Sequence, residues 1–288
     1  RALGTALFSV ILQFILPKKG LTLLAGILSR CRQSLLKALL IKAYCRVFEI
    51  DLLEAKYQKI DEYESFSEFF TRELKEGIRH MPEKAHAIAS PADGTVSSSG
   101  LIKNGSLIQA KGKKYSVTSL LRLDEDISSN YEGGSFITIY LSPKDYHRVH
   151  APIAGSLDYT IEQPGRLFSV NDSTQTRVPD LFVHNERLIC TFSCGLEKQY
   201  SLVMVGALIV RSIETTWEGP ISPYKTQRKR DVKSINFSQG DQIGHFSIGS
   251  TVILLFPKST GRLKHIAAGS RVRVGEDIGE IFTDVETQ

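Results

Sequence analysis

The sequence predicts an α+β protein in which N-terminal amphipathic helices precede a mainly β domain built as a sandwich or barrel. Apolar residues at helical spacing mark residues 21–48, and a helix-capping pattern follows at 65–68. Nine of the ten prolines lie between Pro82 and Pro257, where short β-rich runs alternate with Gly, Asn, Asp or Pro turns. We therefore place a helical region at 1–80 and a β-rich domain at 81–288.

Composition narrows the class of protein. The chain has 288 residues, of which 42% are hydrophobic and 23% are charged. These values are ordinary for a globular protein and exclude disordered, collagen-like and multi-span membrane chains. The length suits one large domain or two small ones.

The first helical segment has two parts. Residues 2–16 are uncharged but short, because a membrane-spanning helix needs ~20 apolar residues. Pro17-Lys18-Lys19 follows this run, where a signal peptide would have a small-residue cleavage site. Residues 21–48 then place basic residues between apolar ones at helical spacing. We predict a pair of interfacial helices lying in one leaflet; the alternative is a helical hairpin that covers the protein's own domain.

Positive charge is concentrated in the same segment. The first 50 residues contain eight Lys or Arg and one Glu, a net charge of +7. The whole chain carries +5, so subtracting +7 leaves −2 for residues 51–288. A nucleic-acid-binding protein usually spreads its basic residues over a folded face. Here they lie on an apolar segment, which indicates an anionic membrane surface and argues against nucleic acid as a partner.

Residues 51–79 are expected to form a second helical region, in which acidic and basic residues are mixed. Within it, Ser65-Phe66-Ser67-Glu68 is a capping-box pattern that begins a helix. Phe69 and Phe70 follow, and we interpret them as core anchors.

The β-rich domain is divided by glycine corners. Residues 240–244 and 274–279 each place a turn before a strand that begins with Ile-Gly. The four cysteines form no CxxC pair, so reduced, cytosol-facing thiols are expected, and Cys190 and Cys194 should share one face of a strand. We expect strands at 135–141, 187–192, 200–213, 251–256 and 271–282.

Two histidines, His147 and His150, lie three residues apart just after an expected strand. They are candidate zinc ligands, but zinc needs three or four convergent ligands and the local sequence offers no third, so we predict no metal. In an extended segment residues three apart point to opposite faces, so the pair need not share one task. A histidine near its ordinary pKa of ~6.5 is suited to general base catalysis.

Asp93 and Ser250 complete a candidate triad with His150. Asp93 lies in an Asp-Gly turn and is a candidate for orienting an imidazole. Ser250 follows Gly249 and precedes six β-forming residues, which is not the strand-to-helix elbow of ordinary serine hydrolases. A serine that follows glycine at the start of a strand can instead attack its own preceding carbonyl. The pattern therefore favours self-cleavage between Gly249 and Ser250.

With these residues in place, the chain resembles the bacterial-type phosphatidylserine decarboxylases, a family of pyruvoyl-dependent enzymes. The Tyr-His-Arg-Val-His and Gly-Ser-Thr blocks, in this order and spacing, are specific to it. The family usually has Leu where Ile248 stands, which is a mild departure. The matching segments cover most of residues 60–260 and are 66–72, 90–94, 140–150, 164–171, 185–187 and 248–252.

The resemblance implies two reactions. In the first, Ser250, assisted by His150 and Asp93, attacks the Gly249 carbonyl, and the resulting ester is eliminated. This yields a β subunit, residues 1–249, and an α subunit, residues 250–288, whose first residue becomes the pyruvoyl cofactor. In the second, the pyruvoyl group forms a Schiff base with phosphatidylserine and releases CO2 and phosphatidylethanolamine. The resemblance assigns this step to His147.

The resemblance also implies a homodimer of processed chains and a peripheral location at the cytoplasmic face of the cell membrane. The basic and backbone donors near Arg166 and Asn171 are candidates for phosphate binding. Three other functions stay open from the residues alone: a zinc peptidase using His147 and His150, a non-enzymatic lipoyl-like or phosphocarrier module, and a serine hydrolase with the triad order of subtilisin.

Overall fold

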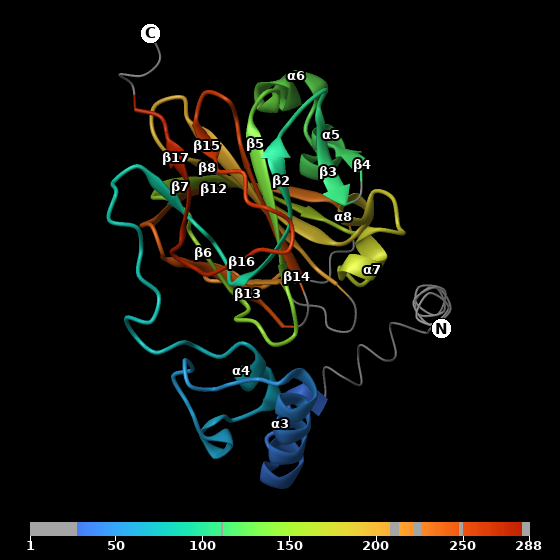
Figure 1. Ribbon diagram of the computed structural model, residues 1–288, viewed down its shortest axis with the longest axis vertical. Helices are drawn as coiled ribbons and strands as arrows, with labels where there is room; N and C mark the ends of the chain where they lie inside the picture. Colours follow the sequence, from blue (N-terminus) through green and yellow to red (C-terminus); the bar gives the residue numbers. More distant parts are fainter. Residues whose placement is uncertain (1–27, 111, 208–212, 222–225, 248–249, 284–288) are drawn as a thin grey trace.

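The chain is seen in a computed structural model that describes residues 28–110, 112–207, 213–221, 226–247 and 250–283 (Figure 1). The expected apolar segment 2–16 and Gly249 lie outside these residues. None of the helices in the described ranges is long and apolar enough to span a membrane.

Helices are short and lie mostly outside the sheets. They are α3 (Ser34–Phe48), η1 (Ile60–Glu62), α4 (Phe66–Phe70), α5 (Val117–Leu121), α6 (Glu125–Ser128), η2 (Ser129–Tyr131), α7 (Asp172–Gln175) and α8 (Leu181–His184). The strands are β1 (Ala87–Ala89), β2 (Gly94–Leu101), β3 (Ser106–Ala110), β4 (Lys113–Ser116), β5 (Ser135–Leu141), β6 (Arg148–His150), β7 (Gly155–Gln163), β8 (Arg187–Ser193), β9 (Gln199–Val205), β10 (Ile213–Thr215), β11 (Gly219–Pro220), β12 (Arg228–Phe237), β13 (Gln242–Phe246), β14 (Ser250–Phe256), β15 (Gly261–Leu263), β16 (Arg271–Val272) and β17 (Asp277–Ile281).

An eight-stranded sheet in the order β12-β7-β8-β9-β14-β5-β2-β16 forms the centre of the molecule. One of its faces packs against the four-stranded sheet β11-β10-β13-β6 and the three-stranded sheet β1-β17-β15, through a shared core that contains Ile139, Val149 and Val252. Its other face is covered by α5, α8 and the β3-β4 hairpin. The α+β prediction is confirmed, and the β part is a layered sandwich whose described strands do not close into a barrel.

The helical N-terminal part differs from the prediction in two places. The predicted helix over 21–48 is interrupted at residues 30–33, and α3 begins only at Ser34. The predicted helical region 51–79 is wrong for most of its length, because only η1 and α4 are helical there. The capping pattern is confirmed at Ser65, whose side chain accepts a hydrogen bond from the Glu68 amide at 3.2 Å.

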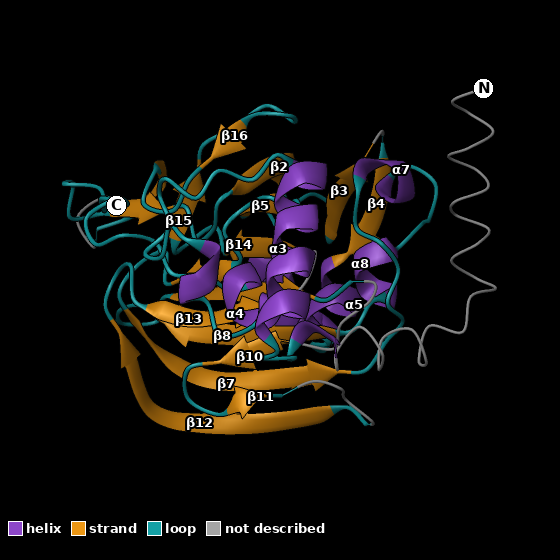
Figure 2. Cartoon of the chain, turned by 90° about the horizontal axis from the view of Figure 1, so that it is seen from below, coloured by secondary structure: helices purple, strands orange, loops and turns teal. Residues whose placement is uncertain are grey.

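These helices form a small core of their own beneath the sheets. Ile41 of α3 packs with Phe66, Phe69 and Phe70 of α4 and with Tyr63. Figures 1 and 2 show α3 and α4 side by side at one end of the β layers. The anchoring role predicted for the phenylalanines is therefore confirmed, but their core is separate from that of the sandwich.

The two glycine corners form as expected. Gly240 and Gly275 both have φ of +88°, a conformation that side chains with a Cβ rarely adopt. A Cβ on Gly275 would lie 2.1 Å from the backbone oxygen of His80, and one on Gly240 would lie 2.9 Å from Met81 Sδ. Both corners thus need glycine and pack on the same stretch of chain. The second corner also divides the predicted strand 271–282 into β16 and β17.

Candidate active site

Three neighbouring strands bring two of the predicted site residues to one edge of the large sheet. Thr251 of β14 and Thr95 of β2 both pair with Tyr140 of β5, from opposite sides. Because β2 and β14 are each antiparallel to β5, their N-terminal ends lie at the same edge. Ser250 therefore begins β14 at the edge where Asp93 precedes β2.

Ser250 is fully buried, and its Oγ has no hydrogen-bond partner among the described residues. Side chains alternate along a strand, so Ser250 points to the same face as Val252 and Leu254. Val252 and Leu254 belong to the core that lies between the large sheet and the four-stranded sheet of β6 and β13. A buried polar group without a partner costs about 1–3 kcal/mol, so this hydroxyl is not explained by packing.

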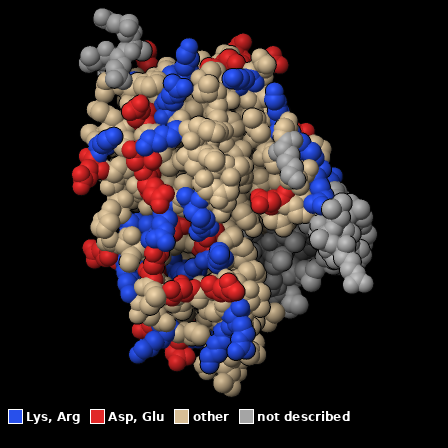
Figure 3. All heavy atoms as spheres, viewed as in Figure 1, with Lys and Arg blue, Asp and Glu red and all other residues tan. Residues whose placement is uncertain are grey.

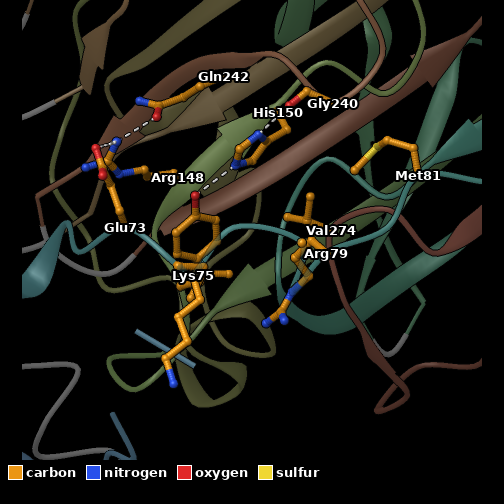
Figure 4. A pocket seen from close by; sticks show the side chains of 12 residues that line it. Glu73, Lys75, Arg79, Met81, Arg148, His150, Gly240, Gln242 and Val274 are labelled. Atoms are coloured by element: carbon orange, nitrogen blue, oxygen red, sulfur yellow. Dashed lines mark hydrogen bonds and ion pairs between the residues drawn. The ribbon is translucent and has the colours of Figure 1, made fainter. Parts of the chain in front are cut away.

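His150 lies at the end of β6 in that covering sheet. Its Nδ1 is 2.8 Å from the Gly240 carbonyl oxygen and its Nε2 is 3.0 Å from the Tyr146 hydroxyl. Figure 4 marks the contact between His150 and Gly240 with a dashed line. A carbonyl only accepts, so we assign the proton to Nδ1 and the lone pair to Nε2. Burial lowers the pKa of His150, although the Gly240 carbonyl and Asp93 act in the opposite direction. The neutral ring thus has a basic nitrogen available at neutral pH.

Asp93 is buried and accepts hydrogen bonds from Arg79 and from the Val274 amide, the latter at 2.8 Å. The turn that contains it is joined to His150, whose amide donates to the Pro91 carbonyl at 2.8 Å. No direct hydrogen bond joins Asp93 to His150, or either of them to Ser250, within the described part of the chain. The structure therefore gathers the three residues around one end of the sandwich, while their roles stay predictions.

His147 lies in the loop that joins β5 to β6 and is fully buried. Its ring stacks on Phe70, with centroids 4.2 Å apart and planes inclined by 21°. Neither ring nitrogen makes a hydrogen bond of normal geometry with the described residues. Burial, reinforced by the positive charge of Arg72, lowers the pKa of His147 to about 3, although Asp145 and the carbonyls of Ser142 and Pro143 oppose this. The imidazole is therefore neutral at physiological pH.

Two adjacent cavities open beside His150 and Asp93. One, of about 280 Å³, is lined by His150, Tyr146, Arg148 and Arg79 (Figure 4). The other, of about 120 Å³, is lined by Asp93 and by several cationic side chains. Those cations are Arg72, Arg79, Lys144, Arg271 and Arg273. No group of three or more metal-ligating side chains occurs among the described residues.

Sequence reasoning missed Tyr146 and Arg79, which contact His150 and Asp93 directly. Tyr146 stands one residue before His147, so its closeness to the histidines was a usable signal. Arg79 had no such signal, because it is 14 residues from Asp93 and meets it only through the fold. Asn171 caps α7 by accepting a hydrogen bond from the Thr174 amide at 3.0 Å, and Arg166 lies over the Phe168 ring. Phosphate binding near these two residues stays a prediction.

The Arg79–Asp93 ion pair makes a prediction about stability. Its side chains are only 10% and 8% exposed, so replacing Arg79 by Met leaves a buried carboxylate without its cation. Breaking such a pair costs about 3–5 kcal/mol, and we expect Arg79→Met to lower the free energy of unfolding by about 3 kcal/mol. Urea unfolding in a Ser250→Ala background measures this on a single chain.

Lys56→Met is the matched control, because it breaks the exposed pair with Glu73, whose side chains are 52% and 44% exposed. Exposed pairs contribute about 0–1 kcal/mol. Equal losses for the two variants would contradict the assignment of Arg79 as the buried counter-ion of Asp93.

Comparison with known proteins places this chain among relatives over nearly its whole length. A family model described as phosphatidylserine decarboxylase matches residues 66–280, and one described as PSD matches residues 8–49. Over 277 residues the chain is 43% identical to a phosphatidylserine decarboxylase proenzyme of Ectopseudomonas mendocina, covering 94% of this chain and 96% of that protein. A proenzyme of the same name from Methylococcus capsulatus is 44% identical over 283 residues, which cover 96% and 98% of the two chains.

Proposed function

Because this chain belongs to the phosphatidylserine decarboxylase family, we propose that it is a proenzyme that cleaves itself and then decarboxylates phosphatidylserine to phosphatidylethanolamine. The observation that supports self-cleavage best is the Ser250 hydroxyl, which is buried at the first residue of β14 and has no hydrogen-bond partner among the described residues. A serine that forms the new N-terminus must lie where both reactions take place. The imidazole of His147 is also fully buried, and neither of its nitrogens makes a hydrogen bond of normal geometry with the described residues, which fits a site that takes a further group.

The proposed cleavage uses only groups of the chain. Nε2 of His150 takes the proton of Ser250 Oγ, either directly or through the Tyr146 hydroxyl, which is hydrogen-bonded to Nε2. Oγ bonds to the Gly249 carbonyl carbon, and the peptide nitrogen leaves with a proton, so an ester replaces the amide. Loss of the residue 250 α-proton then breaks the Cβ–Oγ bond and releases the Gly249 carboxylate. The dehydroalanine left at the new N-terminus takes up water and loses ammonia to become pyruvoyl.

Asp93 is proposed to act on His150 through its charge, because it favours the protonated imidazole that forms when Ser250 is deprotonated. The Gly240 carbonyl holds Nδ1–H and so keeps the tautomer in which Nε2 is the base. In the second reaction the pyruvoyl group supplies an electrophilic carbonyl for the substrate amine and an electron sink for the bond that breaks as CO2 leaves. We propose that His147 contacts the substrate there and handles the proton that replaces CO2.

The substrate class requires the enzyme to work at a membrane, and α3 supports a peripheral location. Leu35, Leu39, Lys42 and Arg46 recur at helical spacing and are all exposed; the leucines are 78% and 66% exposed. Lys37 is one of the basic residues of the segment 21–48 that we predicted to face the membrane. It is buried and donates instead to the Tyr63 carbonyl at 2.6 Å. The outer face of α3 therefore combines apolar and basic side chains, as an interfacial helix does.

Elsewhere the surface is electrostatically mixed. On the face drawn in Figure 3, Lys and Arg are interspersed with Asp and Glu. This agrees with the small net charge of residues 51–288. We accordingly propose a peripheral protein of the cytoplasmic face that binds anionic lipid through its N-terminal segment, and a homodimer as its assembled form.

The double change Leu35→Gln and Leu39→Gln should weaken binding to vesicles that contain phosphatidylserine. Burying a leucine contributes about 1.5–3 kcal/mol, so losing two predicts at least a tenfold lower partition coefficient even with partial insertion. Co-sedimentation with the vesicles measures it. Leu196→Gln is the control, because Leu196 is 88% exposed but lies between β8 and β9, and it should bind like the parent. Equal binding by all three proteins would contradict the docking role of α3.

The activity itself is tested with vesicles of phosphatidylserine carrying a labelled carboxylate. We expect the purified protein to release labelled CO2 and to form phosphatidylethanolamine in equal amounts. Cleaved protein that releases no CO2 from this lipid would contradict the proposed substrate.

A further inference from the structure

The end of α4 touches the loop that carries His147. This part of the chain carries the motif Phe-Ser-Glu-Phe-Phe-Thr-Arg, residues 66–72, whose phenylalanines the sequence predicts as core anchors. Phe66 and Phe69 fit that interpretation, since both lie within the small core of α3 and α4. Phe70 and Arg72 do something more, because each also contacts the β5–β6 loop.

Phe70 provides the surface on which the His147 ring rests, at 4.2 Å between centroids. Arg72 is 6% exposed, and its Nη2 donates to the Lys144 carbonyl at 2.9 Å and, more weakly, to the Asp145 carbonyl at 3.4 Å. One contact therefore sets the plane of the imidazole, and the other fixes the backbone just before it.

The loop is also held on its other sides by the same helical part. The Thr71 carbonyl accepts a hydrogen bond from Arg148 Nε at 2.9 Å, one residue after His147. From α3, the Tyr44 hydroxyl donates to the Pro143 carbonyl at 3.3 Å. The chain is thus held on both sides of His147 in sequence, by α3 before it and by the end of α4 after it.

Such support matters because the ring makes no hydrogen bond of normal geometry with the described residues that would orient it. A buried histidine is usually aimed by hydrogen bonds at its nitrogens. His147 makes none of normal geometry with the described residues, so its two side-chain torsions depend on packing. Both nitrogens stay free for a ligand only if something apolar fixes the ring, and Phe70 is the group in stacking contact with it.

We propose that Phe70 and Arg72 are positioning residues that hold His147 for decarboxylation, so that α4 is a working part of the active site. The inference rests on the proposed function, in which His147 acts in decarboxylation and His150 acts in self-cleavage. It separates the two reactions: damage to this support should impair the second and spare the first.

The test compares Phe70→Leu with Phe66→Leu. Both lose an aromatic ring from the same helix and the same small core, but no ring contact joins Phe66 to His147 within the described residues. We expect both variants to cleave themselves fully, as a denaturing gel would show. A small misplacement of a catalytic group costs up to ~100-fold in rate, so kcat of Phe70→Leu should fall at least tenfold with KM within about twofold. Phe66→Leu should keep kcat within about twofold.

A second readout does not depend on activity. In uncleaved Ser250→Ala protein, the pKa of His147 is followed by NMR of the labelled imidazole. We expect it to rise towards its ordinary value in Phe70→Leu, because water enters beside the ring, and in Arg72→Met, because a nearby positive charge is removed. Asp145 and Arg72 are the charged groups that act on this imidazole, and Phe66→Leu changes neither.

The outcomes distinguish the inference from the function on which it rests. The inference alone is overturned if the parent protein decarboxylates phosphatidylserine but Phe70→Leu and Phe66→Leu show equal losses of kcat and equal pKa values for His147. Parent protein that does not decarboxylate phosphatidylserine overturns the proposed function, while the NMR comparison still decides whether Phe70 and Arg72 control His147. If Phe70→Leu fails to fold, Arg72→Met decides by the same measurements.

Discussion

Ser250→Ala is expected to remain one chain of 32.1 kDa and to show no decarboxylase activity. The substitution removes the oxygen that would attack Gly249, and with it the precursor of the pyruvoyl group. No other residue supplies that oxygen in the proposed mechanism, so the loss should be complete rather than partial. Denaturing gel electrophoresis after prolonged incubation detects cleavage, and the vesicle assay detects activity.

The fold should survive this change, which makes the result interpretable. Ser250 Oγ has no hydrogen-bond partner among the described residues, so its removal leaves no partner unsatisfied. Thr251→Ser serves as the control, because Thr251 is the next residue of β14 and its buried hydroxyl likewise has no partner in the described ranges. That variant should cleave like the parent. Cleavage of Ser250→Ala at the same position would show that another group is the nucleophile.

The two histidines should separate the two reactions. His147→Ala is expected to cleave to completion but to lose decarboxylation, whereas His150→Ala is expected to stay uncleaved. General acid–base catalysis contributes ~100- to 10,000-fold, so each loss should reach at least two orders of magnitude in the affected rate. The time course of cleavage and kcat for vesicles containing phosphatidylserine measure the two reactions independently.

The structure supplies a reason for this division. His150 is partly buried, lines the larger cavity, and has Nε2 available as a base when Tyr146 gives way. His147 stacks on Phe70, and neither of its nitrogens makes a well-formed hydrogen bond with the part of the chain that the structure describes. Failure of His147→Ala to cleave, with its fold intact, would mean that the roles of the two histidines are assigned wrongly.

Local patterns predicted several strands well, although the expected strand 200–213 is too long, because β9 ends at Val205 and residues 206–207 are not strand. β5 begins and ends at the predicted residues, 135 and 141, and β14 begins one residue before its predicted start. Both are apolar, β-forming runs bounded by turn residues, so their conformation is set largely by neighbours in sequence. Ser65 likewise predicted where α4 begins, because a capping side chain acts within one helical turn. Cys190 and Cys194 pack against the same core, as their spacing predicted, although Cys194 lies just beyond the end of β8 at Ser193.

What the sequence could not supply is contact between distant segments. The residues 51–79 have a helix-like mixture of charges, yet several are held by partners far along the chain; Glu54, for example, pairs with both Arg79 and Arg273. Lys37 looked like a lipid-facing cation, but the Tyr63 carbonyl that accepts from it belongs to another element. Arg79 and Phe70 became visible as site residues only when the fold placed them beside Asp93 and His147.

The central claim is that this chain cuts itself between Gly249 and Ser250, and the intact mass of the purified protein tests it most directly. We predict two species, residues 1–249 with a free carboxyl end and residues 250–288 with a pyruvoyl group in place of the N-terminal serine. Edman degradation of the smaller species should be blocked. A single stable species with the mass of the whole chain, under conditions in which the vesicle assay shows CO2 release, would contradict the account.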